Sequence, residues 1–290
     1  MRAPRQLVDD KMSTKDAVTA AKAGVEIARP GNAVVGGVAA LVGGYLGGSL
    51  GFAVGIAAAA TVFGTGAGNA VNDYYDADID AVNNPERPIP SGRLSRRGAA
   101  LLALSFFVAA LVLTVVFLPP LAIGIGVVNL VLLVGYSSHL KRMPLIGNVV
   151  VAYLTGSAFL FGGAAVEGVE FTVILFALAA LANLGREIVK DVEDIEGDAE
   201  EGARTLPVVW GERRALAVAS VAVAVGVVLS PLPYFFFDEF GVEYLISVGA
   251  ADIVFLEGTR RSWKSPSSGQ NLLKIAMVVA LVAFVVGRSL

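Results

Sequence analysis

Two segments of the chain concentrate acidic side chains in the way that divalent-metal chemistry requires. The first is NDYYDADID, Asn72 to Asp80, which places four aspartates in eight positions. The second is GREIVKDVEDIEGD, Gly185 to Asp198. The aspartates of the first segment directly follow 43 residues without a charged side chain. Carboxylates gathered beside such apolar sequence need a counter-charge, because buried like charges repel one another.

A divalent cation would supply that counter-charge. Hard oxygen ligands favour Mg²⁺ or Ca²⁺ over zinc, and Mg²⁺ characteristically joins a few carboxylates to substrate phosphates. The pattern therefore predicts a substrate that carries a diphosphate. An EF-hand loop is excluded, because counting from Asp76 puts Ala81 and Arg87 where that loop needs Gly and Glu. The chain has no cysteine and a single histidine, His139, which excludes thiol catalysis and a histidine-based metal site.

Helical spacing groups the first set of acids on one face. At 100° per residue, Asn72, Asp73, Asp76 and Asp80 fall within about 100° of one another, whereas Asp78 points elsewhere. Three carboxylates and an amide are thus predicted to share a face.

The second set gives a similar pattern if its helix continues far enough. Glu187, Asp191, Asp194 and Asp198 then fall within roughly 60° of one another. Gly197 weakens the helical prediction around Asp198.

Basic and polar residues interleave with the acids, as a phosphate site requires. The candidates for substrate binding are Arg29, Asn32, Arg87, Arg93, Lys141, Arg142, Lys190 and Arg204. Tyr136 is either a substrate contact or an anchor at the membrane interface.

The elements that carry these residues are predicted to be membrane helices. The chain has 290 residues, 56% of them hydrophobic, and a mean hydropathy of +0.71. A bilayer-crossing helix needs about 20 apolar residues. Charge-free runs, with breaks at Gly47–Gly51 and at Pro119–Pro120, predict nine such helices in an all-α polytopic membrane protein. Small residues four apart, such as Gly43 and Gly47, predict close helix packing.

The distribution of basic residues predicts the orientation. If nine helices cross the membrane, 21 of the 22 basic residues fall on one side of it, and only Arg288 falls on the opposite side. Loops rich in Lys and Arg are cytoplasmic. We therefore expect a multi-pass cell-membrane protein with a cytoplasmic amino terminus and the acidic segments on the cytoplasmic side. Residues 1–28 are predicted to be a cytosolic lead-in, with an interfacial helix as one form of it, and residues 29–290 a single transmembrane domain.

The motifs resemble those of the UbiA superfamily of intramembrane prenyltransferases. The signature NDxxDxxxD is matched by Asn72, Asp73, Asp76 and Asp80, and DxxxD by Asp194 and Asp198, preceded by Asp191. NPERPIPSGRLS and YSSHLKR are also similar to the family, and the resemblance runs from about Arg29 to the end. Many members place a lysine four residues after the tyrosine, whereas Tyr136 and Lys141 are five apart.

The resemblance implies a fold and a reaction. The fold is nine helices around a central cavity, with both motifs at its cytosolic mouth and a lateral opening toward lipid. The motif residues would hold Mg²⁺ on the diphosphate of an isoprenyl donor: Asn72, Asp73, Asp76, Asp80, Asp191, Asp194 and Asp198. RPIPSG and VEDIEGDAEEGARTLPVVWG resemble the branch that contains chlorophyll synthases and the archaeal enzymes that make digeranylgeranylglyceryl phosphate. REIVKDVEDIEGD, with Glu187 and Lys190 as further substrate contacts, favours the archaeal enzymes, which use geranylgeranyl diphosphate and a lipid-phosphate acceptor.

Two alternatives stay open from the sequence. The first is another prenyltransferase of the same superfamily, with an aromatic ring or a tetrapyrrole as acceptor. The second is an ion-coupled transporter that uses the carboxylates as an ion pathway. A net charge of −3, with the basic residues in membrane-facing loops, gives nucleic-acid binding no support. No obligatory protein partner is inferred.

Overall fold

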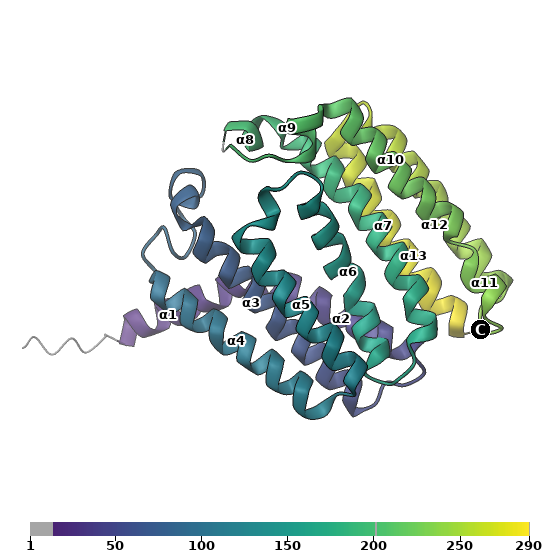
Figure 1. The fold of residues 1–290 in the computed structure, drawn as a ribbon, viewed down its shortest axis with the longest axis horizontal. Coiled ribbons are helices and arrows are strands. Elements are labelled where there is room, and N and C mark those ends of the chain that lie inside the picture. Colours follow the sequence, from purple (N-terminus) through teal and green to yellow (C-terminus); the bar gives the residue numbers. More distant parts are fainter. Residues whose placement is uncertain (1–13, 201, 290) are drawn as a thin grey trace, which may run out of the picture.

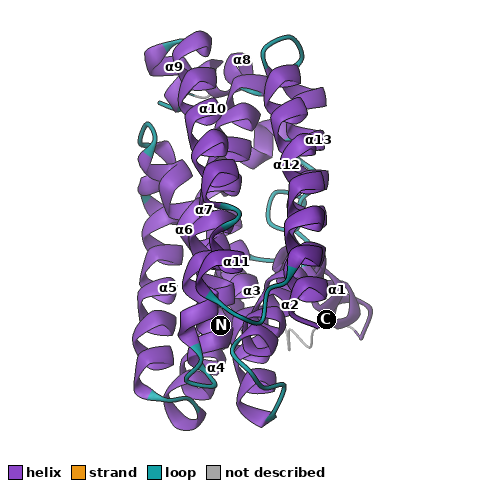
Figure 2. Cartoon of the chain, turned by 90° about the vertical axis from the view of Figure 1, so that its right-hand side faces the viewer, coloured by secondary structure: helices purple, strands orange, loops and turns teal. Residues whose placement is uncertain are grey.

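The structure is a computed structural model that describes residues 14–200 and 202–289, and these residues form helices joined by short loops (Figures 1 and 2). The helices are α1 Thr14–Ala28, α2 Pro30–Leu46, α3 Phe52–Asn83, α4 Arg96–Phe117, α5 Pro120–Ser138, the 3₁₀ turn η1 Leu140–Arg142, α6 Ile146–Ala164, α7 Val169–Glu193, α8 Ile195–Glu200, α9 Leu206–Trp210, α10 Glu212–Leu229, α11 Leu232–Phe236, α12 Val242–Ser262 and α13 Pro266–Ser289. The first thirteen residues of the expected lead-in lie outside the described part.

The two predicted breaks in the long apolar runs are confirmed. Gly47 to Gly51 separate α2 from α3, and Gly48 has a φ of 105°, a left-handed conformation that glycine adopts without strain. At the second break α4 ends at Phe117 and Pro120 begins α5. Proline suits a first helical turn because its missing N–H has no partner there in any case.

The prediction of an all-α chain with many membrane spans is confirmed. By length and composition, seven helical segments of the described residues are able to cross a membrane: α3, α4, α5, α6, α7, the combined stretch Glu212–Phe236 and α13. An eighth is added if the end of α1 and α2, bent by 47° at their junction, count as one span.

The helices are arranged around a central pair (Figure 1). α2 packs along α6 in the middle of the molecule, with α3, α4 and α5 on one side and α7, α10, α12 and α13 on the other. α8 and α9 lie at one end of the bundle. The acidic residues of interest stand at the carboxyl ends of α3 and α7, one helix from each side of the molecule.

Glycines allow the central pair to approach closely, as the small-residue spacing predicts. A Cβ at Gly43 would overlap the carbonyl oxygen of Phe159 on α6, and a Cβ at Gly162 would overlap that of Ala40 on α2. The backbones of α2 and α6 are therefore in direct contact.

We expect Gly162→Ala to lower the melting temperature of the detergent-solubilised protein. The added methyl group meets backbone, which cannot move aside as a side chain can, and such overpacking costs about 1–3 kcal/mol. Gly124→Ala on α5 is the control, since a Cβ there has nothing within 4 Å. Its melting temperature should stay level or rise, because alanine favours helix over glycine. Equal melting temperatures for the two variants would contradict the close contact.

Candidate functional site

The first acidic cluster lies on one face of α3, as the helical spacing predicts. Asp73 and Asp80 are buried, Asp76 is partly buried, and Asn72 donates from Nδ2 to Asp76 Oδ2 at 2.9 Å. Asp78 points away: its side chain is 87% exposed and pairs with Arg96. Spacing alone thus distinguishes the clustered aspartates from the solvated one.

Basic side chains from two different loops neutralise the buried carboxylates. Arg29, between α1 and α2, places Nη2 2.5 Å from Asp73 Oδ1. Arg87, in the loop after α3, lies 2.7 Å from Asp80 Oδ2 and 3.8 Å from Asp73 Oδ1. Buried ions are tolerated only when paired in this way. Both arginines are therefore positioned at the cluster, as the sequence predicts.

A strained backbone holds Arg29 in place. Its φ is 47° and its ψ 68°, a left-handed conformation that non-glycine residues seldom adopt. The following Pro30 disfavours a helical conformation at Arg29, so α1 cannot run straight into α2. Asn69 on α3 fixes the bend, because its Nδ2 donates to the Ala28 carbonyl oxygen at 2.9 Å.

A third cation comes from η1. Lys141 forms an ion pair with Asp76, and its Nζ lies 3.1 Å from the side-chain oxygen of Asn72. All three aspartates of the first motif thus have a basic partner.

The same connecting segment reaches the second cluster. Gly147, at the start of α6, packs against the backbone of Leu140 and Lys141. The next residue, Asn148, is buried and donates from Nδ2 to Asp191 Oδ2 at 2.7 Å. The stretch from Lys141 to Asn148 therefore contacts both motifs, through Asp76 on α3 and Asp191 on α7.

The helix does not continue through the second motif, so the condition for one shared face from Glu187 to Asp198 is not met. α7 ends at Glu193, Asp194 leaves the helical conformation with φ −93° and ψ 7°, and the short α8 begins at Ile195. Negative charges oppose the dipole at a helix carboxyl end, and Gly197 adds a weak helix former. Asp198 therefore stands on a separate helix from Asp191.

The second motif lacks the cations of the first. Within the described residues, Asp191, Asp194 and Asp198 form no ion pair with a basic side chain. Burial, helped by the neighbouring Asp194 carboxylate, raises the pKa of Asp198. Asp191 accepts a hydrogen bond from the neutral amide of Asn148, and Lys190 is the cation within electrostatic range of Asp191 and Asp198. The second motif thus has less positive charge against its carboxylates than the first.

The remaining predicted substrate contacts fall into three groups. Tyr136 lies between the motifs, within electrostatic range of Asp76, Glu187 and Asp191. Glu187 is paired with its neighbour Arg186. Arg93 is paired with Glu26 of α1 rather than with either motif. Four others are exposed, with no ion pair in the described part of the chain: Asn32, Arg142, Lys190 and Arg204.

The oxygen donors of the two motifs suit Mg²⁺. Among the described residues, no three acidic side chains converge closely enough to enclose a metal by themselves. Mg²⁺ does not need such a cage, because it usually binds one or two carboxylates and keeps water or phosphate oxygens as its other ligands. The uncompensated carboxylates of the second motif are where added positive charge fits best.

Asn148 did not emerge from the sequence, because a single asparagine in an apolar run has no distinctive pattern. We expect Asn148→Ala to lower turnover and Mg²⁺ affinity by about 10–100-fold, the range for residues that orient metal ligands. Asn129→Ala on α5 is the control, since Asn129 lines a pocket that contains no residue of either motif. The measurement is product formation over a Mg²⁺ titration. An unchanged Mg²⁺ requirement would contradict the role.

The chain is similar to known proteins over most of its length. Residues 33–285 match the UbiA prenyltransferase family. Digeranylgeranylglyceryl phosphate synthase of Natronomonas pharaonis is 52% identical over 267 residues, 91% of this chain and 96% of the relative. A solved structure of a digeranylgeranylglyceryl phosphate synthase superposes with a TM-score of 0.84 at 35% identity, over 93% of this chain and 99% of that one.

A more distant structure supports the fold alone. A UbiA homologue from Archaeoglobus fulgidus, bound to DMAPP and Mg²⁺, gives a TM-score of 0.73 at 19% identity and covers 92% of this chain and 99% of that one. The match to the family takes in most of α2 to α13 and both acidic motifs. The chain therefore belongs to the UbiA prenyltransferase family.

Proposed function

We propose that this prenyltransferase transfers a geranylgeranyl group from geranylgeranyl diphosphate to the secondary hydroxyl of geranylgeranylglyceryl phosphate. The product would carry the second ether bond of an archaeal membrane lipid. The observation that supports the chemistry is that one connecting segment contacts both carboxylate clusters, through Lys141 and Asn148. The near full-length similarity to digeranylgeranylglyceryl phosphate synthases supports the choice of donor and acceptor.

Mg²⁺ would bind the donor diphosphate between the motifs and stabilise the charge that develops on the leaving group. Asn72, Asp73, Asp76 and Asp80 would hold it on one side, and Asp191, Asp194 and Asp198 on the other. Arg29, Arg87 and Lys141 already stand at the first motif and would donate hydrogen bonds to the phosphate oxygens.

The bond changes follow from the two substrates. The C1–O bond of the donor breaks, and diphosphate leaves with the electron pair. The acceptor hydroxyl oxygen forms the new ether bond to C1, and its proton goes either to a motif carboxylate or to the released diphosphate. The apolar helices around the site would keep water from the reactive allylic carbon.

The phosphate group of the acceptor needs basic side chains that are not already paired with the motif aspartates. Arg142 and Arg204 are exposed and free of ion pairs within the described residues, as is Lys190. We assign the acceptor phosphate to this group, with Tyr136, Glu187 and Asn32 as further substrate contacts. Arg93, held by Glu26, would act by fixing the loop that carries Arg87.

We further propose nine membrane crossings, with the amino terminus and the site on the cytoplasmic side. Two further helices, α2 and α12, would then be added to the seven segments that are able to cross a membrane by length and composition. α2 has 17 residues, a little short of a full span, and α12 carries Glu243, Asp252 and Glu257 within its length. Asp252 is satisfied by the hydroxyl of Ser230 at 2.7 Å. A single hydrogen-bonded acid favours a structural role over an ion pathway.

The test is product analysis by mass spectrometry after incubating purified protein with geranylgeranyl diphosphate and Mg²⁺. Parallel reactions would contain geranylgeranylglyceryl phosphate, 4-hydroxybenzoate or no acceptor. We expect an ether product from the glyceryl phosphate alone. Prenylation of the 4-hydroxybenzoate ring would support prenyl transfer but would show that the acceptor is an aromatic compound. Absence of metal-dependent diphosphate release with every acceptor would overturn the proposal in favour of a transporter.

A further inference from the structure

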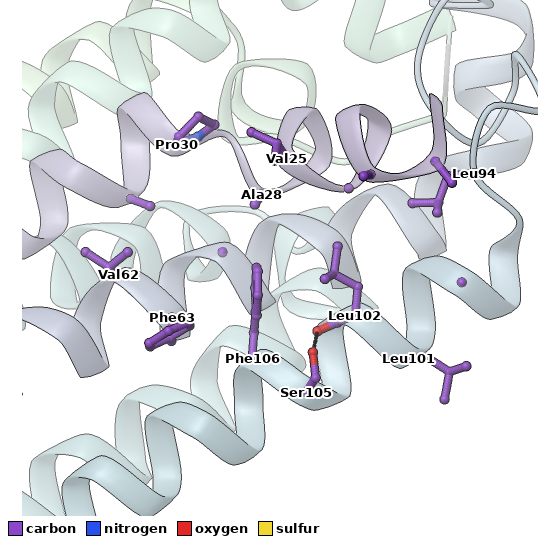
Figure 3. Close-up of a pocket in the computed structure, with 16 residues that line it drawn as sticks. Val25, Ala28, Pro30, Val62, Phe63, Leu94, Leu101, Leu102, Ser105 and Phe106 are labelled. Atoms are coloured by element: carbon purple, nitrogen blue, oxygen red, sulfur yellow. Dashed lines mark hydrogen bonds between the residues drawn. The ribbon is translucent and has the colours of Figure 1, made fainter. Parts of the chain in front are cut away.

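A cavity of about 630 Å³ lies between α1, the start of α2, α3 and α4, apart from the acidic site (Figure 3). None of its lining residues belongs to either motif. Figure 3 shows Phe63 and Phe106 on one side of it and Val25 and Pro30 on the other. Its volume is within the range of about 300–1,000 Å³ that is usual for small-molecule sites.

The lining offers a ligand hydrocarbon contacts only. Ser105 carries the one side-chain hydroxyl among the lining residues, and it already donates to the Leu102 carbonyl oxygen at 2.7 Å. Polar ligand groups placed here would lose their hydrogen bonds to water without replacement. The part of a ligand that enters this cavity must therefore be an apolar chain.

The cavity has the depth of one bilayer leaflet. Along α4 its lining runs from Gly98 to Phe106, about 12 Å at 1.5 Å per residue. Both α3 and α4 are membrane-spanning by length and composition. Half the hydrocarbon core of a bilayer is about 15 Å thick. An apolar chain in this cavity would thus lie at the depth of the lipid chains around it.

Two exposed cations are sequence neighbours of residues that line the cavity. Arg97 precedes Gly98 in the first turn of α4, and Lys22 follows Ala21 on α1. A cation in the first turn of a helix opposes the helix dipole, so Arg97 does not serve helix stability. Its neighbour Arg96 is paired with Asp78, whereas Arg97 and Lys22 have no ion pair within the described residues.

We propose that this cavity binds one hydrocarbon chain of an anionic bilayer phospholipid, whose headgroup phosphate is bound by Arg97 and Lys22. The lipid belongs to the leaflet that borders the acidic clusters. Ala28 and Pro30 line the cavity on either side of Arg29. A bound chain would therefore pack against the bend that positions Arg29 on Asp73.

The test uses phosphatidylglycerol with a photoactivatable diazirine in the middle of one acyl chain. Full-length protein would be reconstituted with it in nanodiscs, irradiated and digested, and the labelled peptides identified by mass spectrometry. We expect residues 62–66 and 98–106 to be labelled more heavily than the exposed faces of α5 and α10. Labelling no heavier there than elsewhere would overturn the proposal.

Two matched leucine variants test whether the labelling comes from a lipid chain inside the cavity. A Cβ at Gly24 lies 3.6 Å from Leu102 Cδ2, an ordinary contact, so Gly24→Leu should extend into the cavity without moving the backbone. Gly124→Leu adds the same side chain to the exposed face of α5. Labelling of residues 98–106 should fall several-fold in the first variant and stay unchanged in the second. Equal labelling in both would contradict chain binding in the cavity.

Two further comparisons test the headgroup and the source of the chain. The preference for labelled phosphatidylglycerol over equally labelled phosphatidylcholine should fall in Arg97→Gln. Unlabelled phosphatidylglycerol should compete with the label, whereas geranylgeranyl diphosphate should not. Competition by the diphosphate alone would assign the cavity to a substrate tail and overturn the proposal. The outcome does not depend on turnover, so it is separable from the test of the proposed reaction.

Discussion

Asp76→Ala should lower turnover by at least about 10²–10³-fold, the loss expected when one group that stabilises developing charge is removed. Asp76 is partly buried, accepts a hydrogen bond from Asn72 and forms an ion pair with Lys141. Its removal takes a ligand from the first motif and frees Lys141 from its partner. The measurement is the rate of diphosphate release at saturating donor, with folding checked by elution of a monodisperse peak in detergent.

Asp78→Ala is the matched control for this variant. It removes the same type of side chain two positions along the same helix, but Asp78 is exposed and pairs only with Arg96. Surface pairs of this kind contribute about 0–1 kcal/mol. We expect activity within twofold of wild type. Near-normal activity of Asp76→Ala, or equal losses in both variants, would remove the basis for the first motif as a metal site.

Removing divalent cations with a chelator should abolish turnover, and adding Mg²⁺ should restore it. The three aspartates of the second motif have no basic partner within the described residues, so they depend on an added cation to hold a diphosphate against their own charge. The measurement is product formation over a Mg²⁺ titration after chelation. Full activity without divalent metal would contradict the assignment.

A measurement of ligand binding distinguishes a variant that no longer binds metal from a variant that no longer folds. Mg²⁺ with inorganic diphosphate should raise the melting temperature of the wild-type protein, since a ligand that binds only the folded state stabilises it. The rise should disappear in Asp194→Ala and persist in Asp78→Ala. An equal rise in both variants would indicate that the second motif takes no part in binding.

The sequence predicted the first motif well because its geometry is local. Helical spacing alone separates Asp73, Asp76 and Asp80 from Asp78, and α3 continues unbroken to Asn83. Breaks at Gly47–Gly51 and Pro119–Pro120 were likewise readable from backbone chemistry. Arg29 was predicted as a contact, but its left-handed backbone was signalled only by the proline that follows it.

Features that depend on tertiary contacts could not be predicted in this way. The break at Asp194 requires a balance between helix propensity and the charge of the surrounding acids. Asn148 acts on Asp191, which is 43 positions away in the sequence. The cavity beside α1 arises where four helices leave space between them, and no spacing within one segment encodes it.

The pairing of the first-motif aspartates has a consequence for how ligands bind. Arg29, Arg87 and Lys141 hold those carboxylates before any ligand arrives. A metal that takes the carboxylates releases the cations, and a diphosphate that takes the cations releases the carboxylates. Each ligand thus frees the partner that the other requires, and thermodynamic linkage makes their cooperativity reciprocal. At the first motif this exchange would favour joint occupancy, because a metal or a diphosphate arriving alone would meet carboxylates and cations that are already paired with one another.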